Sequence, residues 1–192
     1  MMTMTRKIFT VLLSVAILSV SSAAMAGKTE KKRQKILTMR QETLVELFET
    51  RPQAKAEIDD AEGYAVFSNI GVQVLFIGGG GGRGVVHDNK SDIDTYMKMG
   101  TASVGIGLGV KDFRAVFIFH DRKALDKFID KGWDFAGEAD AAARGGDKGG
   151  EIGEGASFRK KVSVYQFTKN GLALQASLHG TKYWKDKKLN RK

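Results

Sequence analysis

The stretch GYAVFSNIGVQVLFIGGGGGRGVVH, from Gly63 to His87, decides the fold class of this chain. Its apolar runs Tyr64–Phe67 and Val72–Ile77 are short and rich in β-branched and aromatic residues, which is typical of strands. The glycine-rich segment Gly78–Gly84 interrupts them before Val85–His87 resumes the pattern. We expect these glycines to form a bend or bulge within a curved sheet.

Strand patterns continue along most of the remaining chain, and Asp88–Asp92 is a polar turn. Asn170-Gly171 is a strong signal for a tight hairpin between the predicted strands Val162–Thr168 and Leu172–Leu178. The predicted strands after the polar turn are Thr101–Val110 and Arg114–His120, which we expect to be neighbours, and then Val162–Thr168, Leu172–Leu178 and Thr181–Trp184.

Helical patterns are fewer than strand patterns. Apolar residues at helical spacing predict a helix over Lys28–Thr50, which Pro52 stops, and a short one over Ala54–Ala61. Asp121 is a predicted N-cap for a helix over Ala124–Asp130, and Trp133–Ala143 is a further candidate. The fold class is therefore α+β: a curved antiparallel sheet or partly closed barrel covered by a few helices.

The N-terminus has the three parts of a secretory signal. Arg6 and Lys7 are followed by an apolar run, Ile8–Val20, and the segment ends at the small-residue site Ala24-Met25-Ala26. The run has about 13 residues, fewer than the roughly 20 that span a bilayer. We therefore expect residues 1–26 to be removed and the mature protein to be periplasmic and soluble.

Charge and composition limit the function classes. The chain carries a formal net charge of +9 and has no cysteine, which excludes disulfides and cysteine-ligated metals. A basic protein attracts polyanions. Export makes nucleic acid an improbable partner, so we expect none, and anionic lipid head groups or lipid phosphates become the expected partner.

No catalytic constellation stands out, so we expect no enzyme, no cofactor and no metal. Gly79-x-Gly81-x-x-Gly84 has the letters of a dinucleotide fingerprint but is followed by a strand instead of a helix. His120-Asp121 is a strand end and a helix cap. The acidic residues Asp88, Asp92 and Asp94 fit a solvated turn better than a calcium loop.

Glycines alternate along the predicted strand after Thr101. Ser103, Gly105, Gly107 and Gly109 would share one nearly bare face of that strand. A bare strand face lets another group approach the backbone. We expect this face to accept a helix or ring of the same protein, or as an alternative an acyl chain in an apolar groove.

The order of motifs resembles the SYLF domain family. A basic helix is followed by Gly63–Gly71, the glycine-rich Gly78–Gly84 and Ser103–Gly109, and the series ends with the four motifs Ala115–Phe119, Ala124–Phe128, Trp133–Ala139 and Val164–Leu172. Ser68 stands where the family tends to have proline. The resemblance implies a lipid-binding activity. The residues themselves indicate a signal at 1–26, a basic amphipathic helical segment at 27–62 and a basic tail at 185–192, and the resemblance makes 63–184 a SYLF-like β-rich core. We expect the basic tail to fray.

The resemblance and the charge together predict a lipid-interacting protein with two basic sets. The first set lies at the start of the mature chain: Lys28, Lys31, Lys32, Arg33 and Lys35. The second set comes from the C-terminal part: Arg159, Lys160, Lys161, Lys182 and Lys185, with Lys187 and Lys188 beyond them. Both sets are expected to meet anionic head groups, or as an alternative to aid solubility on a solvated face.

Two other functions stay open at this point. The same basic sets would also suit an acidic envelope protein, which makes the chain an interaction or structural module. An uncharacterised hydrolase is the third possibility, with His120 as the residue to test.

Overall fold

The computed structural model describes residues 3–69, 79–102, 114–134, 161–168, 171–174 and 181–191. The chain divides into two units, Met1–Lys35 and Ile36–Lys192. Helix α1 (Thr3–Thr50) supplies the first unit and, from Ile36 onward, the first element of the second. No helix in the described ranges has both the length and the apolar character needed to span a membrane.

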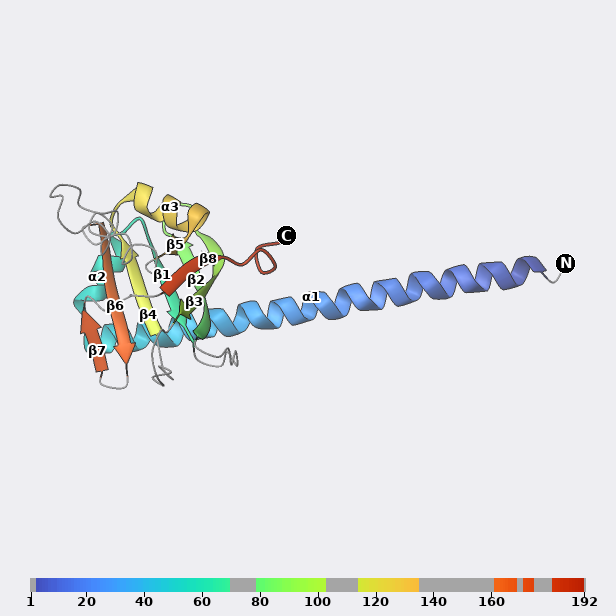
Figure 1. Ribbon diagram of the computed structural model, residues 1–192, viewed down its shortest axis with the longest axis horizontal. Coiled ribbons are helices and arrows are strands. Elements are labelled where there is room, and N and C mark those ends of the chain that lie inside the picture. Colours follow the sequence, from blue (N-terminus) through green and yellow to red (C-terminus); the bar gives the residue numbers. More distant parts are fainter. Residues whose placement is uncertain are drawn as a thin grey trace. The chain divides into compact units, whose positions relative to one another are not determined.

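One antiparallel sheet forms the framework of the second unit (Figure 1). Its eight described strands run in the order β5-β8-β3-β2-β1-β4-β6-β7, and every neighbouring pair is antiparallel. The bounds are β1 Gly63–Ser68, β2 Gly79–Asp88, β3 Ile93–Ala102, β4 Arg114–Phe119, β5 Trp133–Asp134, β6 Val162–Thr168, β7 Gly171–Leu174 and β8 Thr181–Lys185. The predicted α+β class with a curved antiparallel sheet is confirmed.

Two short helices accompany the sheet. Helix α2 (Gln53–Asp59) follows Pro52 as predicted, and α3 (Arg122–Lys131) connects β4 to β5. The carboxylate of Asp121 accepts a hydrogen bond from the backbone N–H of Ala124 at 3.0 Å. The predicted N-cap is confirmed, because that bond satisfies one of the donors left free at a helix start.

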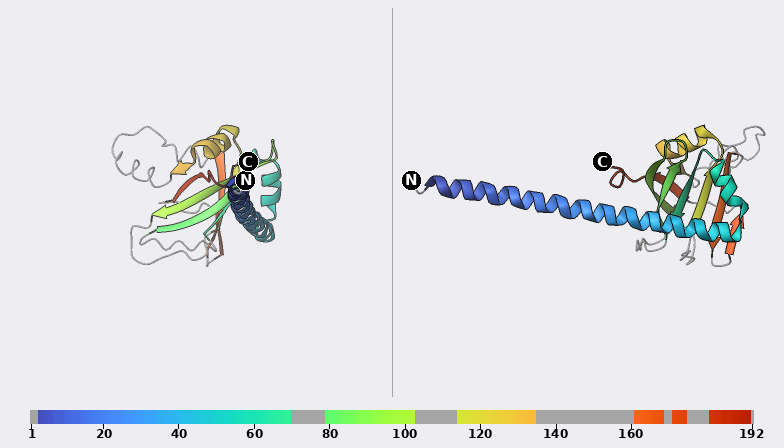
Figure 2. Two further views of the ribbon diagram at one scale, coloured as in Figure 1. Left: turned by 90° about the vertical axis from the view of Figure 1, so that its right-hand side faces the viewer. Right: turned by 180° about the vertical axis from the view of Figure 1, so that it is seen from behind.

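The sheet has a core on each face. Helix α3 packs on one face, which we call the aromatic face, where Phe67, Phe117, Phe128 and Tyr183 form a cluster of rings 4.7–6.0 Å apart. Helix α2 and the C-terminal part of α1 pack on the other, which we call the helix face. Figure 2 shows the strands lying between α2 and α3.

An ion pair and apolar side chains together hold α1 on the helix face. Leu47 of α1 is completely buried against Val66 and Val116 of the central strands. Arg114 at the start of β4 donates to both carboxylate oxygens of Glu46, with Nη2 3.1 Å from Oε1. The second half of the predicted helix Lys28–Thr50 is thus an integral part of the sheet domain.

The described part of the glycine-rich segment, Gly79–Gly84, is strand, and the predicted bulge is wrong there. Strands β2 and β3 pair one to one from Gly79 and Ala102 to Asp88 and Ile93, without an extra residue. A Cβ at Gly82 would lie 2.6 Å from the Ser68 carbonyl oxygen, and one at Gly84 would collide with Val66 and Phe67. These glycines let the neighbouring strand and its rings approach closely.

Strand β3 differs from the prediction in position and in neighbours. It begins at Ile93, before the predicted start at Thr101, and its partners are β2 and β8 instead of β4. Buried Met97 and Met99 alternate with half-exposed Tyr96 and Lys98, as a strand with one face in the core requires. Residues 103–113, like the predicted strand 72–77, lie outside the described ranges.

Two further local predictions are settled by strand pairing. Trp133 and Asp134 pair with Tyr183 and Lys182 as strand β5, so the prediction of a helix beginning at Trp133 is wrong for these two residues. Thr168 pairs with Gly171 across a two-residue connection, which confirms the predicted hairpin. The predicted glycine-rich loop 145–155 falls outside the described part of the chain.

The C-terminal residues after β8 are packed, so the prediction that they fray is wrong for 186–191. Leu189 is 3% exposed and packs with Ile36 and Val85 on the helix face. The Asn190 side chain accepts from the Tyr96 N–H at 2.9 Å and donates to the Tyr96 carbonyl at 2.7 Å. Asn190 thereby binds both backbone groups of Tyr96 just beyond the end of β8, where the Asp186 N–H also donates to the Tyr96 carbonyl at 2.9 Å.

Candidate functional site

Four lysines of the first predicted set share one face of α1. Successive helical residues are turned by about 100°, so Lys28, Lys31, Lys32 and Lys35 fall within an arc of about 100°. All four side chains are exposed. These four residues all belong to the first unit, and we call them the lysine face.

The lysine face carries no counter-charge among the side chains that the structure describes. Glu30, the nearest acid, points elsewhere on the helix: it accepts from Gln34 at 3.0 Å and lies 3.4 Å from Arg33. The hydrogen bond from Gln34, with a weaker contribution from Arg33, lowers the pKa of Glu30. The four ammonium groups therefore present their full charge to solvent.

The second predicted set is different, because Lys161, Lys182 and Lys185 are each paired with an aspartate, whereas Lys187 and Lys188 are exposed. Lys161 Nζ lies 3.3 Å from Asp121 Oδ1, Lys182 Nζ 3.0 Å from Asp134 Oδ2 and Lys185 Nζ 3.6 Å from Asp130 Oδ1. Each pair links two elements of the sheet domain. Arg159 and Lys160 lie outside the described residues, as do Ser103, Gly105, Gly107 and Gly109 of the predicted groove.

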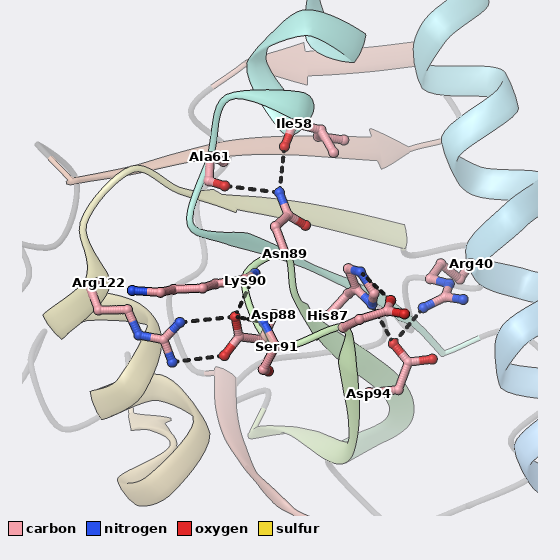
Figure 3. Close-up of polar contacts among 11 residues, drawn as sticks. Arg40, Ile58, Ala61, His87, Asp88, Asn89, Lys90, Ser91, Asp94 and Arg122 are labelled. Atoms are coloured by element: carbon pink, nitrogen blue, oxygen red, sulfur yellow. Dashed lines mark hydrogen bonds and ion pairs between the residues drawn. The ribbon is translucent and has the colours of Figure 1, made fainter.

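Asp88 joins three elements at the β2–β3 turn (Figure 3). Its two oxygens lie 2.9 and 2.8 Å from the guanidinium nitrogens of Arg122, at the start of α3. Oδ1 also accepts from the N–H groups of Lys90 and Ser91 in the turn. Arg122, more than the turn, holds the pKa of Asp88 far below its usual range. The carboxylate is thus occupied by structural partners.

The neighbouring carboxylate, Asp94, fastens α1 to the same turn. Its Oδ1 lies 2.7 Å from Arg40 Nη1 of α1 and 2.8 Å from His87 Nδ1 (Figure 3). Asn89 donates to the carbonyls of Ile58 and Ala61 at 2.7 and 2.9 Å, which ties the turn to the end of α2. The acidic turn is a structural junction between the helices and the sheet.

His120 does not have the geometry of a Ser-His-acid triad. Both of its neighbours meet the same ring nitrogen: Nε2 lies 2.9 Å from Ser163 Oγ and 3.2 Å from Glu57 Oε1. In a Ser-His-acid triad the acid orients the opposite nitrogen. Glu57 accepts from the Tyr165 hydroxyl at 2.7 Å, and burial together with Glu57 raises the pKa of Tyr165 to about 12. The group holds α2 against β4 and β6.

Comparison with known proteins identifies the family. Residues 100–192 match the family model described as Ysc84, Las17-binding protein actin regulator. The chain is also 36% identical, over 163 residues, to Beta cell expansion factor A of Aeromonas veronii. Residues 100–192 thus match the Ysc84, or SYLF, domain family. The resemblance inferred from the motifs is confirmed.

The SYLF family is associated with lipid binding or actin regulation. The aligned region covers 84% of this chain but 60% of the Aeromonas protein, so the chain spans less than two thirds of that relative. Neither description names an enzymatic activity.

A further surface of the sheet was missed by the sequence analysis. Arg83 of β2 pairs with Lys98 of β3, and Lys98 pairs with Trp184 of β8. We call these three residues the Trp184 patch. The alternation of Met97 and Met99 in the sequence was the available signal, because it places Lys98 away from the core. The pairing of β3 with β8 is non-local and had no such signal.

Proposed function

We propose that this chain is a non-enzymatic module of the periplasm that binds anionic phospholipid surfaces or lipid phosphates. The observation that carries the proposal is the lysine face, where four exposed ammonium groups without a described partner occupy one side of a helix. The net charge, +9 for the whole chain and +7 without Arg6 and Lys7 of the signal, and the family's association with lipid binding support it. The periplasmic location rests on the predicted signal.

The magnitude of the attraction fits reversible adsorption. A Lys or Arg near an anionic membrane contributes about 1 kcal/mol, and the attraction fades within a Debye length of about 10 Å at 0.1 M salt. Four lysines would give about 4 kcal/mol, which corresponds to roughly a thousandfold increase in binding. The binding should therefore weaken steeply as salt is added.

Vesicle sedimentation tests the proposal. The full chain is mixed with neutral phosphatidylcholine vesicles or with vesicles that also contain phosphatidylglycerol. We expect sedimentation with the anionic vesicles alone, and a loss of at least a hundredfold in affinity when Lys28, Lys31, Lys32 and Lys35 are all changed to glutamine.

A matched control variant distinguishes the effect of where the lysines lie from the effect of total charge. Lys55, Lys90, Lys123 and Lys131 are exposed lysines of the sheet domain, and changing all four to glutamine removes the same charge. The control variant should keep most of the binding. Equal losses in the two variants would show that net charge alone, and not the lysine face, is responsible.

A protein partner is the second candidate, favoured by the description of the matching family, which names Las17 binding. For this chain it would mean an acidic envelope protein meeting the same lysines. Failure of the wild type to sediment with any vesicle, with an acidic protein captured through the lysine face, would replace the lipid proposal with this one.

A further inference from the structure

Arg83, Lys98 and Trp184 form one row across three strands. Residues that pair directly in an antiparallel sheet project from the same face, with Cβ atoms about 5 Å apart. Arg83 lies two residues from Val85, which packs with Ile36 and Leu189. The Trp184 patch therefore lies on the helix face, one row beyond the part that Ile36 and Leu189 cover.

The charges of this row are unbalanced. Lys98 Nζ lies 3.7 Å from Asp186 Oδ2, a buried carboxylate that also accepts from the Lys188 and Leu189 N–H groups. Arg83 is half-exposed and has no hydrogen-bond or ion-pair partner within the described residues. Like charges directly opposite each other destabilise a sheet. An anion placed between Arg83 and Lys98 would relieve that repulsion.

Trp184 is the aromatic end of the row. Its side chain is among the three large apolar ones that remain exposed in the described ranges, at 39%. The ring lies over Gly100, where an added Cβ would be 3.0 Å from the indole Cη2. Gly100 itself pairs with Gly81, so the indole rests beside a strip of bare backbone. An indole held beside cations in this way is typical of groups that sit at a membrane interface.

We propose that the Trp184 patch is a second docking surface for an anionic lipid membrane, with head-group phosphate at Arg83 and Lys98 and the indole of Trp184 in the interface. This inference rests on the proposed function and extends it to a surface of the sheet. Charge complementarity selects an anionic occupant. The exposed indole favours an occupant that has an apolar layer, as a membrane does, rather than a soluble anion.

Fluorescence of Trp184 tests the inference directly. The chain has two tryptophans, and Trp133 is 7% exposed, so the difference between wild type and W184F reports on Trp184. We expect the Trp184 emission to shift to the blue, and its quenching by acrylamide to fall, when phosphatidylglycerol vesicles are added. Inorganic phosphate at the same phosphate concentration should leave the emission unchanged.

Single-charge variants test the cationic part of the patch. Removing one interfacial cation should weaken vesicle binding about fivefold, so R83Q is expected to bind that much less tightly. Arg51 is an exposed arginine at the end of α1, and R51Q is the matched control, which should bind as the wild type does.

The outcomes separate this inference from the proposed function. Sedimentation with anionic vesicles while Trp184 emission stays unchanged would overturn the inference and leave the lysine face standing. An emission shift produced by inorganic phosphate alone would also overturn it, because the occupant would then be a soluble anion. No sedimentation at all would overturn the proposed function first, and the second surface with it.

Discussion

The glycines of β2 show how single residues set the fold without forming a ligand site. Gly82 and Gly84 lie against the backbone and rings of β1 and the side chain of Met99, so they have a packing role. The sequence excluded a dinucleotide site there because no helix follows. It could not show why glycine is needed, since that depends on which strand lies alongside.

Replacing Gly84 by alanine should destabilise the domain strongly. The new Cβ would collide with the Val66 carbonyl and the Phe67 ring, both of which are completely buried. Overpacking of this kind typically costs about 1–3 kcal/mol, and we expect the upper end because one obstacle is backbone. Gly100→Ala is the control: it meets only the Trp184 ring, which can move. Equal urea midpoints for the two variants would contradict this packing role.

Asp88 should matter far more to stability than Asp92, the exposed acid of its turn. Asp88→Asn removes the charge that both Arg122 nitrogens contact, and we expect a loss of about 2 kcal/mol in the free energy of unfolding. Asp92 is exposed, so Asp92→Asn should change that free energy by less than about 0.5 kcal/mol. Urea unfolding near neutral pH measures both values.

The same pair predicts a pH dependence. Because Arg122 depresses the pKa of Asp88 in the folded state, the stabilisation is complete above the unfolded pKa of about 3.9 and is lost as the pH falls below it. The difference in urea midpoint between wild type and D88N should therefore shrink as the solution is acidified. A constant difference down to acidic pH would show that Asp88 acts through shape instead of charge.

At the scale of elements, the sequence predicted local structure reliably, but it did not predict which distant strands pair. The Asp121 cap and the Asn170-Gly171 hairpin depend on neighbours in the sequence, and both predictions were correct. Strand β3 and the ion pairs of Lys182 and Lys185 depend on β8 reaching β3, which periodicity does not encode. The paired lysines of the second set were therefore indistinguishable in sequence from the free lysines of α1.

The C-terminal element supplies a stability prediction. Leu189→Ala should cost about 2–4 kcal/mol, because the side chain is 3% exposed and packs on Ile36 and Val85. Lys187→Ala, two residues away and exposed, should have little effect. Thermal unfolding of both variants measures the difference, and equal midpoints would mean that residues 186–191 contribute nothing to the core.

At the scale of the whole molecule, composition indicated the class of protein and the motif order its family. The α+β class and the SYLF resemblance were both predicted from sequence and confirmed. The sequence could not predict which lysines stay unpaired, because this depends on the partners that each lysine finds after folding. The structure separates the four unpaired lysines of α1 from the three paired ones of the sheet domain.

Salt dependence of vesicle binding tests the central claim most directly. The affinity of the full chain for phosphatidylglycerol vesicles is measured by sedimentation from about 0.05 to 0.5 M salt, a range over which the Debye length falls severalfold. Adsorption through the lysine face predicts a steep loss of affinity with salt in the wild type and a shallow one in the four-lysine variant. Affinity that is independent of salt, or parallel slopes for the two proteins, would contradict the account.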